Sequence, residues 1–151
     1  DLSALKYITH EQASDKFLVN PGDLLFNRTN SKELVGKTAV YYGPQPMAYA
    51  GYLVRGRVKK GISPEYISAF LNSNYGKTTL RWMCKNIVGM ANINAKEFAA
   101  IKIPAPPEDK QARFQKLVLD IRERKNRMIQ TASRQDELFA SIQVDVFQNK
   151  S

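Results

Sequence analysis

The chain has 151 residues, which is enough for one ordinary domain or for a small domain followed by a long helix. Its one cysteine, Cys84, excludes an internal disulfide and a zinc cluster, and no apolar run approaches the roughly 20 residues that span a membrane. These features predict a cytoplasmic protein with no membrane partner. The net charge is +9, and residues 1–104 hold 14 of the 23 lysines and arginines against 7 acids. A basic surface of this kind favours a polyanionic partner such as nucleic acid.

The first half of the chain alternates short apolar runs with turn signals. Residues 20–23 read Asn-Pro-Gly-Asp and predict a turn, after which residues 24–28 are expected to form a short buried strand. The polar residues 29–32 predict a loop. Two further strands are expected, over residues 36–42 and 49–58. Four tyrosines on these strands could contact nucleic acid, although half-buried sheet positions are their more common role: Tyr41, Tyr42, Tyr49 and Tyr52.

Two helices are predicted next. Ser63, Pro64 and Glu65 have the order of an N-cap, a first-turn proline and a first-turn acid, so a helix should begin here and end near residues 72–74. A second helix is expected over residues 75–86. The side chains predicted to face inward from these two helices are Ile67, Phe70, Leu71, Leu80, Met83 and Cys84.

The remaining short elements complete an α+β fold. Residues 89–94 predict a loop or short strand, Asn94 resembles an N-cap that opens a short helical turn, and residues 101–104 predict a last strand. We therefore expect a small mixed α/β head with a twisted β-sheet and short helices, over residues 1–107. One long coiled-coil helix, the arm, should follow over residues 108–151.

The arm has an almost unbroken heptad pattern and is entered through a proline hinge at residues 104–107. Steps of four and three residues from Phe114 reach ten positions, of which eight are apolar, and only Lys125 and Gln135 are polar. The eight apolar seam residues are Phe114, Val118, Ile121, Met128, Ala132, Phe139, Ile142 and Val146. A strict period of 3.5 residues predicts a seam that is buried against another helix. No second helix of that length is expected in the chain, so its partner should be another molecule.

Residue patterns for catalysis are scarce. The chain contains neither a GxxxxGK[ST] phosphate loop nor a GxGxxG motif, and no metal-ligand spacing is present. A single histidine, His10, is more often a structural residue than a base. Glu108 and Lys110 have a nuclease-like spacing but lack a suitably placed partner acid, so a small nuclease is the weaker alternative. We therefore expect no enzyme activity, no metal and no cofactor.

Three polar segments have side chains that suit DNA. Arginine can pair with guanine and asparagine with adenine, each through two hydrogen bonds, while lysine and hydroxyl groups can hold phosphates. The first segment contains Arg28, Thr29, Asn30, Ser31, Lys32 and, further along, Lys37. The second contains Arg55 and Arg57, and the third contains Gly89, Met90, Ala91 and Asn92. For the first segment taken alone, an ordinary polar surface turn is the alternative reading.

These pieces, in this order, resemble the specificity subunit of type I restriction–modification systems. The resemblance rests on PGDLLFNRTNS (21–31), VGK (35–37), YISAFLNS (66–73), ANIN (91–94), IKIPAPP (101–107), Gln111 and the helical spacer that ends LFASI (138–142). It covers most of the chain and implies one target-recognition domain, apparently incomplete at its N-terminus, with its spacer helix.

The resemblance also implies a function. A full subunit of this family has two target-recognition domains, each reading one half of a bipartite site in double-stranded DNA, with two antiparallel helices between them. It has no catalysis of its own. It docks methyltransferase subunits, which bind S-adenosylmethionine, and a translocase-nuclease subunit joins for cleavage. A self-pairing half-subunit would also fit, and the alternative function is a docking or assembly module that does not read DNA.

Overall fold

The computed structural model describes residues 17–31, 34–87 and 90–147. The chain divides into two compact units, residues 1–112 and 113–151. The first unit contains the head and the first turn of the arm, and the second unit contains the rest of the arm. This is the predicted architecture of a small mixed head with short strands and helices followed by one long helix.

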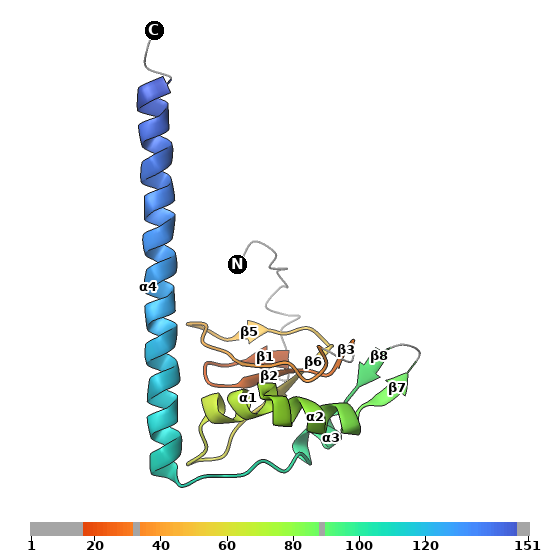
Figure 1. The fold of residues 1–151 in the computed structure, drawn as a ribbon. Coiled ribbons are helices and arrows are strands. Elements are labelled where there is room, and N and C mark those ends of the chain that lie inside the picture. The colour runs from red at the N-terminus through yellow and green to blue at the C-terminus, as the bar shows by residue number, and fades with distance from the viewer. Residues whose placement is uncertain (1–16, 32–33, 88–89, 148–151) are drawn as a thin grey trace. The chain divides into compact units, whose positions relative to one another are not determined.

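Three small antiparallel sheets form the strand layer of the head (Figure 1). The central sheet has the order β4-β2-β6, with the strands β2 (Leu24–Asn27), β4 (Thr38–Val40) and β6 (Leu53–Gly56). A second sheet pairs β1 (Leu18–Val19) with β5 (Met47–Ala48). The third has the order β3-β8-β7, with β3 (Thr29–Asn30), β8 (Met90–Asn92) and β7 (Lys85–Ile87).

Local capping signals determine where the helices begin. The helix α1 (Pro64–Asn72) starts after Ser63, whose hydroxyl accepts a hydrogen bond from the backbone N–H of Tyr66. Ser73 ends α1 and caps α2 (Asn74–Met83). The short helix α3 (Ala95–Ala99) begins with a capping box between Asn94 and Glu97. The arm is the 40-residue helix α4 (Glu108–Phe147), about 60 Å long at 1.5 Å per residue.

The core of the head lies between the central sheet and the two helices α1 and α2. Its fully buried members come from separate elements and loops: Phe26, Val35, Leu71, Leu80, Ala91 and Ile93. The rings of Phe26 and Phe98 lie 4.3 Å apart between centroids, so α3 also closes on this core. Each large side chain buried here contributes about 1.5–3 kcal/mol of hydrophobic free energy.

Four element predictions are wrong in detail. The second helix ends at Met83, because Cys84 is extended and the chain enters β7. Residues 29–30 are not a loop, because they pair with β8. The expected strand over 49–58 is interrupted by a turn in which Leu53 N–H bonds to Ala50 O, and only residues 53–56 form β6.

The last of these concerns residues 101–104, which form no strand. Ile101 and Ile103 nevertheless pack against the core. The alternating apolar pattern therefore indicated their burial, and only the predicted strand was wrong. Pro104 has no backbone N–H with which to extend a ladder of strand hydrogen bonds.

Candidate nucleic-acid interface

The short sheet β3-β8-β7 brings together two segments that the sequence predicted separately. Thr29 pairs with Asn92, and Asn30 pairs with Ala91. The backbone N–H of Ile93 donates to Arg28 O at 2.9 Å, which continues the ladder to Arg28. Because directly opposed residues in an antiparallel pair share a face, the side chains of Thr29 and Asn92 lie side by side. The first and third predicted DNA segments therefore lie side by side in this sheet, and we call the paired residues 28–30 and 91–93 the recognition edge (Figure 1).

Three buried polar atoms at this edge lack a hydrogen-bond partner among the described residues. They are Oδ1 of Asn27, Nε of Arg28 and Oδ1 of Asn92. Leaving such a group unpaired costs about 1–3 kcal/mol, so an unpaired buried group requires an explanation such as a ligand. Asn27 was missed by sequence reasoning, and its place directly before Arg28 at the end of a buried strand is the signal that could have found it.

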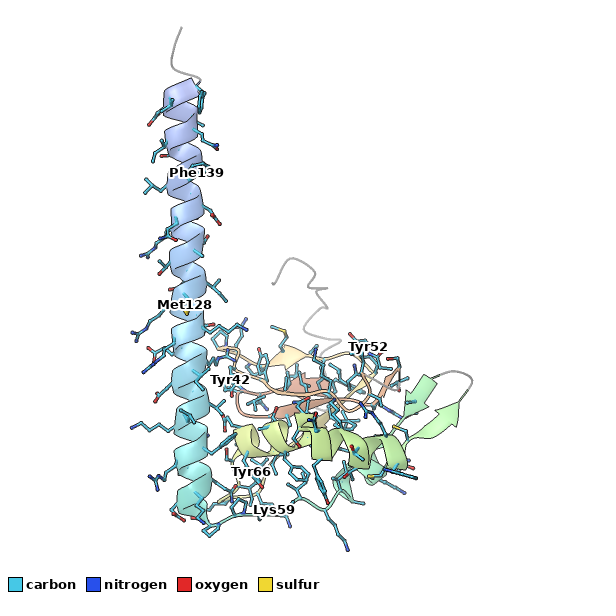
Figure 2. The ribbon with its side chains drawn as sticks, viewed as in Figure 1. Tyr42, Tyr52, Lys59, Tyr66, Met128 and Phe139 are labelled. Carbon is cyan, nitrogen blue, oxygen red and sulfur yellow. The ribbon has the colours of Figure 1, made fainter. Side chains whose placement is uncertain are left out.

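Backbone hydrogen bonds place Lys37 and Tyr52 on either side of this edge. Asn27 N–H donates to Lys37 O at 3.0 Å, and Arg28 N–H donates to Tyr52 O at 3.0 Å. Lys37 is exposed, and Tyr52, labelled in Figure 2, is 58% exposed, so both side chains are accessible. Tyr52 is therefore a surface residue of the candidate interface.

Arg55 and Arg57, the second predicted segment, are not brought to this edge. Arg57 Nε lies 3.3 Å from the carboxylate of Asp23, and the Arg55 guanidinium donates to the carbonyl of Leu18. Asp23 precedes β2, whereas Arg28 follows it, so the two ends are roughly 15 Å apart at 3.3 Å per residue. The two arginines make contacts within the head as a separate basic group, and their contact with DNA stays a prediction.

Other predicted residues have mixed outcomes. Ala91 is 0% exposed and belongs to the core, so its predicted contact with DNA is wrong for the side chain. Asn30 Oδ1 accepts the backbone N–H of Ser31 at 2.8 Å, which leaves its amide NH2 group for other partners. Met90 lies in β8. Lys32, Gly89 and the discounted His10 lie outside the described residues.

The three described carboxylates of the head all make hydrogen bonds inside it. Asp23 bonds to Arg57 and to the backbone of Asn20, Glu65 bonds to Ser63 and Tyr42, and Glu97 closes the α3 capping box. The exposed basic side chains are Lys37, Arg57, Lys59, Lys60, Arg81, Lys96 and Lys102. Among the described residues of the head, the fully exposed charged side chains are therefore all basic.

The arm exposes its apolar seam. Five of the eight seam residues are large and 47–73% exposed: Ile121, Met128, Phe139, Ile142 and Val146. Ala132 is also exposed, while Phe114 and Val118 are half-buried. A shallow depression on α4 is lined by Ile121, Arg124, Lys125, Met128, Ile129 and Ala132. Figure 2 shows Met128 and Phe139 along this helix.

Within residues 17–31, 34–87 and 90–147, no three histidine, cysteine or acidic side chains gather in a way that could hold a metal ion. No helix in the same part of the chain is long and apolar enough to cross a membrane.

The fold and site define a basic α+β head, with polar groups gathered at one sheet edge, that continues into a helix with an exposed apolar seam. No protein-family model matches the chain. A curated protein of Methanocaldococcus jannaschii named "Putative type I restriction enzyme MjaX specificity subunit" is 30% identical over 142 residues, which are 91% of this chain and 32% of the relative. The type I restriction enzyme EcoKI specificity subunit of Escherichia coli is 30% identical over 105 residues, 68% of this chain and 23% of the relative.

These matches confirm the resemblance found in the sequence. Over most of its length, the chain is homologous to type I restriction enzyme specificity subunits. It spans about a third or less of the length of these two relatives.

Proposed function

We propose that this chain is a DNA-recognition part of a type I restriction–modification specificity subunit and reads one half of a bipartite site. The observation that carries the proposal is the pairing of β3 with β8, which brings together the two segments that contain Arg28 and Asn92, with a buried unpaired polar atom on each of these residues. The chain itself would be non-catalytic. Methyltransferase subunits, which bind S-adenosylmethionine, and a translocase-nuclease subunit would be its protein partners.

The chemistry of the edge suits direct base readout. An arginine pairs with the O6 and N7 acceptors of guanine, and an asparagine pairs with the N6 and N7 groups of adenine. The major groove of DNA admits a two-stranded β-ribbon, the type of element that β7 and β8 form. Both atoms are buried, and a turn of the two side chains toward a bound base would give Arg28 Nε and Asn92 Oδ1 the hydrogen-bond partners that they lack among the described residues.

Arg28→Ala tests this proposal. If Arg28 reads a base, the change should weaken binding to cognate DNA by roughly 1–3 kcal/mol and binding to random duplexes far less. The cognate sequence is first obtained by selecting random duplexes with the chain and its methyltransferase subunit. Lys102→Ala removes one exposed positive charge elsewhere on the head and is the matched control. Equal losses of affinity for cognate and random DNA would mean that Arg28 contacts a phosphate and not a base. If the selection enriches no sequence, the result would favour the alternative function, a docking module that does not read DNA.

We also propose that the arm assembles through its seam, with a second copy of this chain as partner. In an antiparallel pair the opposed residues are Phe114 with Val146, Val118 with Ile142, Ile121 with Phe139, Met128 with Ala132, and Lys125 with Gln135. The two polar interruptions of the seam therefore meet each other. A parallel pair in register would instead oppose two copies of Lys125, and like charges at a buried position are unfavourable.

Flanking charges support the same orientation. Arg122 and Asp136 follow the seam residues Ile121 and Gln135, and antiparallel pairing would place them opposite each other at the edge of the interface. Such flanking ion pairs set the orientation of helices in coiled coils. Two joined heads would present two copies of the same sheet edge to DNA.

The assembly proposal is tested by Ile121→Asp combined with Met128→Asp, measured by analytical ultracentrifugation. The double change should abolish self-association and leave the head folded. The control is Asn126→Asp combined with Ser133→Asp, which adds the same charge on the opposite side of the heptad. An oligomer that persists in the seam variant would refute pairing through this face.

A further inference from the structure

A close approach between a loop and α2 gathers three basic residues on the head. A Cβ atom built on Gly36 would lie only 2.4 Å from Leu80 Cδ1, so the backbone at Gly36 rests directly on that side chain. Lys37 is the next residue of the loop. On α2, Lys77 lies about one turn before Leu80 and Arg81 directly after it. Residues four apart on a helix are neighbours, so Lys77 and Arg81 share a face.

The electrostatics of this group indicate uncompensated positive charge. Burial, and then the positive charges of Lys37 and Arg81, lower the pKa of Lys77. The three described carboxylates of the head are all used in the hydrogen bonds given above. The folded head therefore disfavours the charged form of Lys77, and an anionic partner beside the three cations would favour it.

The basic group is continuous with the proposed recognition edge. Lys37 O accepts the backbone N–H of Asn27, the residue before Arg28. Trp82 follows Arg81 in the last turn of α2, and its side chain is 86% exposed. A surface of positive charge beside the base-reading residues is where a duplex would bring its phosphates.

We propose that Lys77 and Arg81 of α2, together with Lys37, bind the phosphate backbone of duplex DNA beside the β3-β8 edge. This inference rests on the proposed function and deepens it, because it assigns contacts that position the duplex without reading its sequence. The sequence predictions placed no DNA contact on α2.

The test is Lys77→Gln combined with Arg81→Gln, measured as duplex affinity against salt concentration. Each phosphate contact contributes about −0.9 to the slope of log K against log salt, so the variant should lose about 1.8 of the slope. Between 50 and 200 mM salt, the ratio of wild-type to variant affinity should then fall about twelvefold. The loss should be the same for cognate and random duplexes. Lys102→Gln combined with Lys110→Gln removes the same charge from exposed positions and should retain the wild-type slope.

A second measurement localises the contact without changing the surface. Trp82 is the one tryptophan of the chain and adjoins Arg81, so its fluorescence reports on this end of α2. Bound duplex should protect Trp82 from quenching by acrylamide.

The outcomes separate the inference from the proposed function. A wild-type chain that shows no salt-dependent duplex binding would overturn both. If the wild-type chain binds duplex but the α2 variant keeps the wild-type salt slope, only the α2 surface is overturned. The same conclusion follows if acrylamide still quenches Trp82 fully when DNA is saturating. A lost slope together with protection of Trp82 would establish it.

Discussion

Replacing Gly36 with alanine should destabilise the head, because Gly36 combines two demands that alanine does not meet. Its φ of +74° is in the left-handed region, and its missing Cβ leaves room for the buried side chain of Leu80. The same residue sets the start of the loop that carries Lys37. Gly36→Ala therefore tests the local geometry on which both the recognition edge and the α2 surface depend.

The two demands contribute separate penalties. A residue with a Cβ costs about 1–2 kcal/mol in the left-handed region. The contact of 2.4 Å with Leu80 Cδ1 is too short for any Cβ, so the fully buried Leu80 must shift, and overpacking of this kind costs about 1–3 kcal/mol. The expected loss is thus about 2–5 kcal/mol, a large share of the roughly 5–15 kcal/mol that stabilises a domain.

Urea denaturation followed by circular dichroism measures this loss. With a denaturant dependence of about 2 kcal/mol per molar, a loss of 3 kcal/mol lowers the midpoint by about 1.5 M. Two glycines serve as controls. Gly22 has a φ of +89° with no atom within 4 Å of its added Cβ, so Gly22→Ala isolates the backbone penalty. Gly51 has open space and no positive φ, so Gly51→Ala should be nearly neutral.

The order of the three variants decides the outcome. Gly36→Ala should be the least stable, Gly22→Ala intermediate and Gly51→Ala close to wild type. If Gly36→Ala matches Gly22→Ala within about 0.5 kcal/mol, Leu80 relaxes freely and the steric argument is refuted. If Gly22→Ala matches Gly51→Ala, the backbone argument is refuted.

Three further predictions concern stability. Gln111 is buried, accepts Ser63 N–H at 3.1 Å and donates to Pro106 O at 2.8 Å, so Gln111→Ala should cost about 2–4 kcal/mol in urea denaturation by leaving two backbone groups unpaired. Asn94→Ala removes the acceptor for two backbone N–H groups of α3 and should cost about 1 kcal/mol in the same assay, whereas an unchanged midpoint would argue against the capping box. The pKa of Lys77 is lowered, so the folded state disfavours its charged form, and Lys77→Gln should raise the thermal midpoint at low salt and neutral pH. For the same reason the stability of the wild type should rise as pH rises through the folded-state pKa of Lys77, and the variant should lack this rise.

Much of the fold was predictable because its signals are local. The N-cap at Ser63 requires only the residues of one helical turn, and the structure places α1 directly after it. The proline hinge and the first-turn acids likewise predicted the start of α4 at Glu108. The seam of the arm is a periodic pattern within one continuous helix. The exposure of Ile121 and Met128 follows from that pattern, because the described part of the chain contains no second helix of this length.

The site depended on contacts between distant parts of the chain. Residues 29–30 have the composition of a loop, and only pairing with β8 makes them a strand and places Asn92 beside Thr29. From sequence alone, Arg57 and Arg28 were equally good candidates for DNA contact. In the structure Asp23 pairs with Arg57, whereas Nε of Arg28 has no hydrogen-bond partner among the described residues.

The sequence by itself determined the basic head, the helix starts and the apolar seam, since each depends on composition or on a pattern within one segment. The resemblance to type I specificity subunits also came from the sequence, through motifs spread along most of the chain. Only the tertiary structure decided which polar side chains meet. Antiparallel register joined the two recognition segments, and the contact of Gly36 with Leu80 brought Lys37 beside Lys77. Such contacts depend on how distant segments pack against each other, and a local sequence pattern does not determine that packing.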